Sequence, residues 1–213
     1  MHKADAFVLD KEKEFRKLND ELLKGCRLTQ EAISKTAGVL MNYDAQKMQE
    51  ITDNNKKIGV LYAAFEVYCA NAVKQREPES AAVRLLSSGL SIYAELKEIS
   101  LLTVRIAESL PDLNPEIRDK YKINIAQFVK IFQNVTWNAV FSFLKQDTEF
   151  AKRTISASLE LKRICHRMRG NISGTDGLSE SVTDSSSSLL FIIQRVEDIA
   201  VHTVCIAQNV LCP

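Results

Sequence analysis

The 213-residue sequence predicts an all-α protein of six long antiparallel helices, arranged as two tandem three-helix repeats. One observation is the scarcity of turn-forming residues: Gly 7 and Pro 4 are too few for a sandwich or barrel of this length. Another is that apolar residues recur at steps of three and four along most of the chain, which places them on one helical face. The last is a sequence similarity between the two halves of the chain.

The first half, residues 1–110, contains two breaks in this apolar pattern. One break ends at Asp44, a residue type suited to cap the following helix at its N-terminus. The other is at Pro78, because the residue before a proline avoids helical angles. The helices expected in the first half therefore cover residues 11–41, 45–75 and 79–110.

The second half, residues 111–213, is divided in a similar way. Pro111 and Pro115 bracket the connector between the halves, and Asp147 repeats the capping position of the first half. The only Gly-rich stretch, 170–177, forms the last break. The helices expected here cover residues 116–146, 148–169 and 182–211, and short connections between such long helices favour an antiparallel bundle.

An internal repeat links the two halves. When residues 87–110 are shifted by one hundred positions onto residues 187–210, nine of 24 pairs are identical without a gap. Most of these identities fall on the apolar stripe of the helix. They are Ser87/Ser187, Ser88/Ser188, Leu90/Leu190, Ile92/Ile192, Ile99/Ile199, Thr103/Thr203, Val104/Val204, Ile106/Ile206 and Ala107/Ala207. The sequence therefore predicts two copies of one three-helix unit.

Charge and composition exclude several classes of protein. The net charge of +1 gives no broad positive field for non-specific nucleic-acid binding, so no nucleic-acid partner is expected. No stretch reaches the roughly 18 apolar residues of a membrane span. The charged opening of the chain is unlike a signal peptide. Five scattered cysteines without a CxxC motif indicate reduced, mostly buried thiols, so the expected location is cytoplasmic.

The order of several short motifs resembles the PhoU domain family. In the first half these are a loop ending in Asp44, an Asp-x-x-x-x-Ile phrase at residues 53–58, a turn at Arg76-Glu77-Pro78, and a helix that contains Arg84 and ends in Ile-Ala-Glu at 106–108. The second half is similar through FLKQDTEFAKR and VEDIAVHTVCIAQNV. The resemblance extends from about residue 15 to residue 210, and tandem copies are the usual arrangement of this family.

The resemblance implies a cytoplasmic regulator of phosphate uptake rather than an enzyme. Its expected partners are the ATPase of an ABC phosphate transporter and a membrane sensor kinase, and its expected effect is to lower phosphate-starvation signalling by protein contact. Relatives often form homodimers, and apolar residues such as Trp137, Phe141 and Phe143 would allow one. The alternatives are a metal-binding bundle and a scaffold for another transporter or regulatory partner, because a fold does not fix a function.

The resemblance also implies metal binding by acidic residues four apart on the third helix of each repeat. With the Ile-Ala pair fixing the register, these positions are Lys97 and Leu101 in the first repeat, and Glu197 and Val201 in the second. Only one of the four is acidic. A multinuclear metal site of the family type is therefore expected to be absent or much altered.

Neighbouring residues could replace the missing ligands. Glu197, Asp198 and His202 are the candidate ligands for a divalent or iron-type ion, with Asp198 and His202 on one helix face at i, i+4. The alternative is that Asp198 and His202 form an ordinary ion pair on the helix surface. No catalytic constellation is recognised.

A basic cluster precedes the Gly-rich stretch and consists of Lys162, Arg163, Arg167 and Arg169. It could receive phosphate or an acidic partner. The alternative is that these residues form the last turn of the helix at 148–169, where positive charge complements the helix dipole.

Overall fold

A computed structural model of the chain describes residues 3–74, 76–77, 80–173 and 180–211, and all long elements within these ranges are helices. The predicted all-α fold is confirmed. The helices are α1 (Lys3–Met41), α2 (Ala45–Val73), α3 (Ala81–Glu108), α4 (Pro115–Lys120), α5 (Lys122–Lys145), α6 (Thr148–Ser173) and α7 (Glu180–Leu211). None of the helices in the described part of the chain is both long and apolar enough to cross a membrane.

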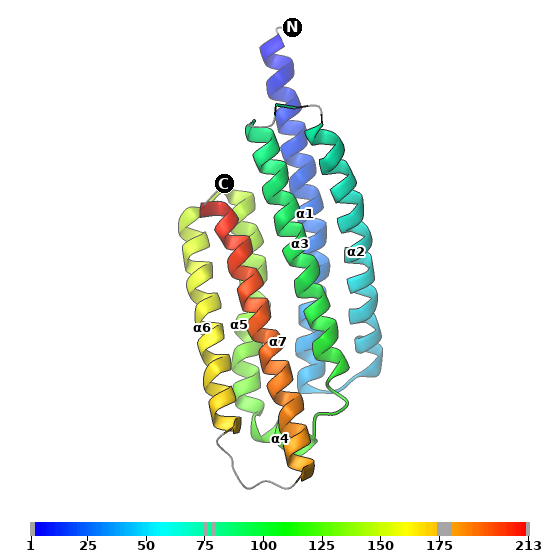
Figure 1. The fold of residues 1–213 in the computed structure, drawn as a ribbon, viewed down its shortest axis with the longest axis vertical. Helices are drawn as coiled ribbons and strands as arrows, with labels where there is room; N and C mark the ends of the chain where they lie inside the picture. The colour runs from blue at the N-terminus through cyan, green and yellow to red at the C-terminus, as the bar shows by residue number, and fades with distance from the viewer. Residues whose placement is uncertain (1–2, 75, 78–79, 174–179, 212–213) are drawn as a thin grey trace.

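The helices form two bundles that lie side by side (Figure 1). α1, α2 and α3 pack on one another in the first bundle, and α5, α6 and α7 do so in the second. The bundles meet where α3 packs on α7 and α1 packs on α5. α2 and α6 therefore lie at the outer edges of the molecule, each in the same place within its bundle (Figure 1).

Side-chain caps define the turns that the sequence predicted. The Asp44 carboxylate accepts hydrogen bonds from the backbone N–H groups of Gln46 and Lys47 at 3.0 and 3.2 Å. Asp147 accepts one from the N–H of Phe150 at 2.8 Å. Before Asp147 the chain reverses through Gln146, whose φ of 53° lies in the left-handed region. Both predicted capping positions are confirmed, and each satisfies N–H groups that a helix start leaves without partners.

The fourth predicted helix is split, so the described part of the chain contains seven helices rather than six. Asn114 caps α4 by accepting from the N–H of Glu116 at 2.7 Å, and Pro115 occupies the first turn. At Tyr121 the backbone leaves helical geometry, with φ −101° and ψ 9°, and α5 begins at the next residue. The apolar side of α4 is nonetheless buried, since Ile117 and Tyr121 are only 7% and 9% exposed.

The two bundles have similar cores. Ile106 of α3 and Ile206 of α7, which the repeat pairs with each other, are both fully buried, as are Thr103 and Thr203. Cys26, Cys69 and Cys165 are buried free thiols, and burial raises the pKa of Cys26 and Cys165 to about 12. The pattern of packing is what a duplication would produce, and the division at residue 110 stays a prediction.

Candidate functional site

The positions that correspond to the family metal motif lie on α3 and α7 and do not form a set of oxygen ligands. Lys97 places its ammonium group 5.0 Å from the ring centroid of Tyr62 on α2. Leu101 is half-buried, and Val201 is 45% exposed to solvent. An ammonium group and two aliphatic side chains cannot coordinate a hard cation. The residues at these four positions therefore do not fit the metal site that the resemblance implies.

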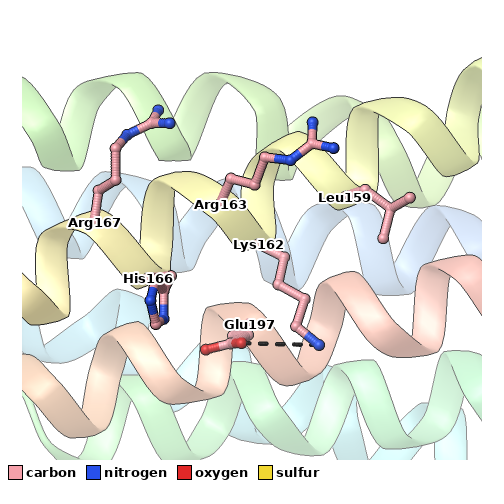
Figure 2. A pocket seen from close by; sticks show the side chains of 6 residues that line it. All are labelled: Leu159, Lys162, Arg163, His166, Arg167 and Glu197. Carbon is pink, nitrogen blue, oxygen red and sulfur yellow. Dashed lines mark ion pairs between the residues drawn. The ribbon is translucent and has the colours of Figure 1, made fainter.

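Glu197, the one acidic residue of the four, is held by two basic side chains of α6. It is 7% exposed, and Arg169 Nη2 lies 3.0 Å from its Oε2. This contact is ionic rather than an aligned hydrogen bond, because that oxygen has no hydrogen-bond donor in good geometry. Lys162 Nζ lies 4.0 Å from Oε1 (Figure 2). The negative charge of Glu197 is thus matched by side chains of the protein itself.

Asp198 and His202 face different partners, although they are one helical turn apart. Asp198 Oδ2 lies 3.3 Å from Arg195 Nη1, and its Oδ1 accepts a hydrogen bond from Gln194 at 3.0 Å. His202 Nδ1 lies 2.6 Å from Glu95 Oε2 on α3. The expected surface ion pair between Asp198 and His202 is therefore replaced by a contact between helices. Within the described ranges, no three His, Cys, Asp or Glu side chains come together closely enough to hold a metal ion.

The contact between Glu95 and His202 joins the two bundles, because α3 belongs to the first and α7 to the second. The hydrogen bond to Glu95 raises the pKa of His202, with desolvation opposing the shift and the negative charges of Glu95, Glu98 and Asp198 adding to it. The imidazolium form is therefore favoured in the folded protein. This pair could not be predicted from the sequence, since residues 107 apart in the chain meet only through the packing of α3 on α7.

Replacing His202 by glutamine is expected to remove a pH-dependent part of the stability. A group whose pKa is raised on folding stabilises the fold fully below its unfolded value, here 6.5, and loses that effect as the pH rises through the folded value. His202→Gln should thus cost about 1 kcal/mol at pH 5.5 and close to nothing at pH 9. Urea unfolding of both proteins at these pH values tests this. An equal difference at the two pH values would contradict it.

A basic groove lies between α6 and α7 next to Glu197. It has a volume of about 390 Å³ and is lined by Leu159, Lys162, Arg163, His166, Arg167 and Glu197. Figure 2 shows that Lys162 and His166 point from α6 toward Glu197, whereas Arg163 and Arg167 project away from it on the other side of the helix. α6 continues to Ser173, so no basic residue lies in its last turn. The expected role of the cluster in complementing a helix end is therefore wrong.

Apolar residues suggested for a dimer interface fall into two groups. Phe143 is 2% exposed and belongs to the core. Trp137 and Phe141 are 37% and 36% exposed and their rings stack with centroids 6.3 Å apart. Phe141 also meets the edge of Phe150 at 6.1 Å. An aromatic cluster is thus available on the α5–α6 side of the molecule.

Comparison with known proteins agrees with the resemblance found in the sequence. The PhoU domain model matches residues 22–110. The "Phosphate-specific transport system accessory protein PhoU homolog" of Aquifex aeolicus is 25% identical over 156 residues, which are 73% of this chain and 71% of that protein. The "Phosphate-specific transport system accessory protein PhoU homolog 1" of Methanothermobacter thermautotrophicus is 23% identical over 143 residues, 65% of each protein.

Solved structures share the fold over nearly the whole chain. The crystal structure of the phosphate transport system regulatory protein PhoU from Streptococcus pneumoniae has a TM-score of 0.82 at 18% identity, covering 94% of each chain. That of PhoU from Pseudomonas aeruginosa has a TM-score of 0.84 at 14% identity, covering 94% of this chain and 96% of the other. The chain therefore contains a stretch, residues 22–110, that matches the PhoU domain, and the resemblance to the PhoU family that its sequence motifs indicated is confirmed.

Proposed function

We propose that this protein is a cytoplasmic accessory regulator of phosphate transport that acts by contact with other proteins and not as an enzyme. The observation that carries the proposal is the PhoU domain, set in a fold shared with two PhoU crystal structures over 94% of the chain. Two relatives are named as accessory proteins of phosphate-specific transport. The expected partners are the ATPase of an ABC phosphate transporter and a membrane sensor kinase, and the expected effect is lower phosphate-starvation signalling.

The departure from the family metal motif favours regulation by protein contact over metal chemistry. Lys97, Leu101 and Val201 supply no oxygen ligand, and Glu197 is engaged by Arg169 and Lys162. Metal binding at Glu197, Asp198 and His202 remains a prediction. Elemental analysis of the purified protein tests it, and a stoichiometric amount of iron, manganese or magnesium would support the alternative of a metal-binding bundle.

Deletion of the gene from its host tests the regulatory function directly. The deletion strain should express phosphate-starvation genes in phosphate-rich medium, and the wild-type gene on a plasmid should restore repression. Purified tagged protein should also retain the transporter ATPase or the sensor kinase supplied as a purified partner. Unchanged starvation signalling together with no retained partner would contradict the proposal and favour a scaffold outside phosphate metabolism.

A homodimer is the second part of this proposal. The half-exposed rings of Trp137 and Phe141 offer apolar surface on one side of the molecule, and aromatic residues are enriched in protein interfaces. The chain has a mass of 24.0 kDa, and sedimentation equilibrium should give twice this value. Trp137→Ser combined with Phe141→Ser should shift the protein to the monomer, whereas a monomeric wild-type protein would contradict this part.

A further inference from the structure

Positive charge is concentrated on one part of the molecule, although the whole chain is nearly neutral. Residues 122–173, which form α5, α6 and the turn between them, carry nine Lys or Arg and three Asp or Glu, a net charge of +6. The remainder of the chain carries 19 basic and 24 acidic residues, a net charge of −5. The overall charge of +1 therefore conceals a strongly basic region on the side of the second bundle (Figure 1).

The basic residues of α6 outnumber the carboxylates that contact them. Glu160 is shared by Arg163 Nη1 at 3.1 Å and Arg167 Nη2 at 3.5 Å. Glu197 is shared in the same way by Arg169 and Lys162. Four positive side chains thus meet two carboxylates, which leaves an excess of two positive charges along α6.

The excess charge is accessible and is spread along the helix. The side chains of Lys162, Arg163 and Arg167 are 49%, 68% and 64% exposed. Residues 162 and 169 are separated by about 10 Å along the axis at a rise of about 1.5 Å per residue. A single small anion could contact only part of such a row, and solvent would screen each exposed contact. An extended ligand with several negative charges matches the row better.

The groove also offers apolar surface, which narrows the class of ligand. Leu159 lies at one end of the lining and is 44% exposed. The carboxylates of Glu160 and Glu197 are set among the basic residues and would repel an unbroken row of phosphates. A polypeptide can place acidic side chains opposite the arginines and an aliphatic side chain opposite Leu159. A nucleic acid backbone or an anionic membrane surface does not combine acidic groups and aliphatic side chains in this way.

We propose that the exposed face of α6, together with the groove that it borders against α7, is a docking surface for an acidic segment of a partner protein that carries an aliphatic anchor residue. The acidic side chains pair with Lys162, Arg163 and Arg167, and the anchor packs on Leu159. This inference rests on the proposed function, because it assigns the surface through which a contact regulator would hold its partner. α2, which lies at the opposite edge of the molecule, carries three basic and three acidic residues and offers no such excess of charge.

Fluorescence anisotropy with a labelled glutamate peptide that has leucine at every fourth position tests the surface directly. The full-length protein should bind this peptide, and raising the salt concentration should weaken binding. Arg163→Glu combined with Arg167→Glu should weaken binding by about tenfold or more, because two repulsive charges replace two attractive ones. Leu159→Gln should weaken binding to the leucine-containing peptide and leave binding to a peptide of glutamate and serine unchanged.

A charge reversal of the same size on α2 provides the control. Lys56 and Lys57 are exposed, so the variant Lys56→Glu with Lys57→Glu should fold and bind the peptide within about twofold of the wild-type protein. If this variant lost as much peptide binding as the α6 variant, the proposal would be overturned, since the loss would then come from net charge alone. The proposal would also be overturned if the protein bound double-stranded DNA or phosphatidylserine vesicles more tightly than the peptide and the α6 variant lost that binding.

The same variants separate this inference from the proposed function. If the wild-type protein and the α6 variant retain the ATPase or the kinase equally well, the proposed docking surface is contradicted and the proposed function is supported. If the peptide binds as expected but neither the ATPase nor the kinase is retained, the proposed docking surface is supported and the proposed partners are contradicted. Circular dichroism and urea unfolding of each variant confirm that the folded protein is compared in every case.

Discussion

Replacing Tyr93 by alanine is expected to lower the free energy of unfolding by about 3–5 kcal/mol. Tyr93 of α3 is fully buried, and its ring lies 5.5 Å from that of Phe65 and 6.1 Å from that of Tyr62, both on α2. A β-carbon built on Gly25 of α1 would come within 2.8 Å of its Cζ. The ring thus fills the space where the three helices of the first bundle meet, and its removal leaves a cavity among all of them. Urea unfolding followed by circular dichroism measures the loss.

Replacing Tyr93 by phenylalanine is the matched control. The Tyr93 hydroxyl is buried and has no hydrogen-bond partner among the described residues, and burial raises its pKa. Because an unpaired polar group costs free energy when buried, the phenylalanine variant should equal the wild-type protein or exceed it by about 1 kcal/mol. If phenylalanine proves as destabilising as alanine, the hydroxyl has a hydrogen-bond partner, and the loss of that hydrogen bond rather than the cavity destabilises both variants.

The helices and their caps could be predicted because the signals lie within a few residues of one another. Asp44 and Asp147 each follow the end of one apolar stripe and precede the next, and both cap a helix. The break at Tyr121 carried no such signal, since it contains no Gly or Pro and the apolar spacing continues through it. The end of α6 was placed too early because Gly170 looks like a terminator, whereas one glycine within a helix costs only about 1 kcal/mol.

The site could be predicted only in part, because its contacts join helices far apart in the sequence. The spacing of Asp198 and His202 correctly places them one turn apart on α7. Which carboxylate His202 meets depends on how α3 packs against α7, and that packing brings Glu95 within 2.6 Å. The basic residues of α6 were recognised, but their relation to Glu197 requires the register of α6 against α7. Spacing along one helix contains no information about this register.

Arg169→Ala is expected to cost about 2–3 kcal/mol of unfolding free energy, because it leaves the buried carboxylate of Glu197 with a weaker ion-pair contact, to Lys162 at 4.0 Å. Arg167→Ala provides the matched control on the same helix. Arg167 is 64% exposed and lies 3.5 Å from Glu160, so its loss should change the stability by no more than about 0.5 kcal/mol. Urea unfolding of the two variants side by side measures the difference.

The double replacement Arg169→Met with Glu197→Leu distinguishes an ion pair from a ligand site. When both charges are replaced by apolar side chains of similar volume, no charge is left buried, and the stability should return to within about 1 kcal/mol of the wild-type protein. Adding metal provides a second test of the role of Glu197. If Glu197 pairs with Arg169 and Lys162 of α6 and does not bind a cation, iron or manganese should not raise the free energy of unfolding of the wild-type protein or of Arg169→Ala. A metal-dependent gain confined to Arg169→Ala would mean that Arg169 occupies the place of a cation at a position where the family has a ligand, and that the ion pair is what excludes metal here.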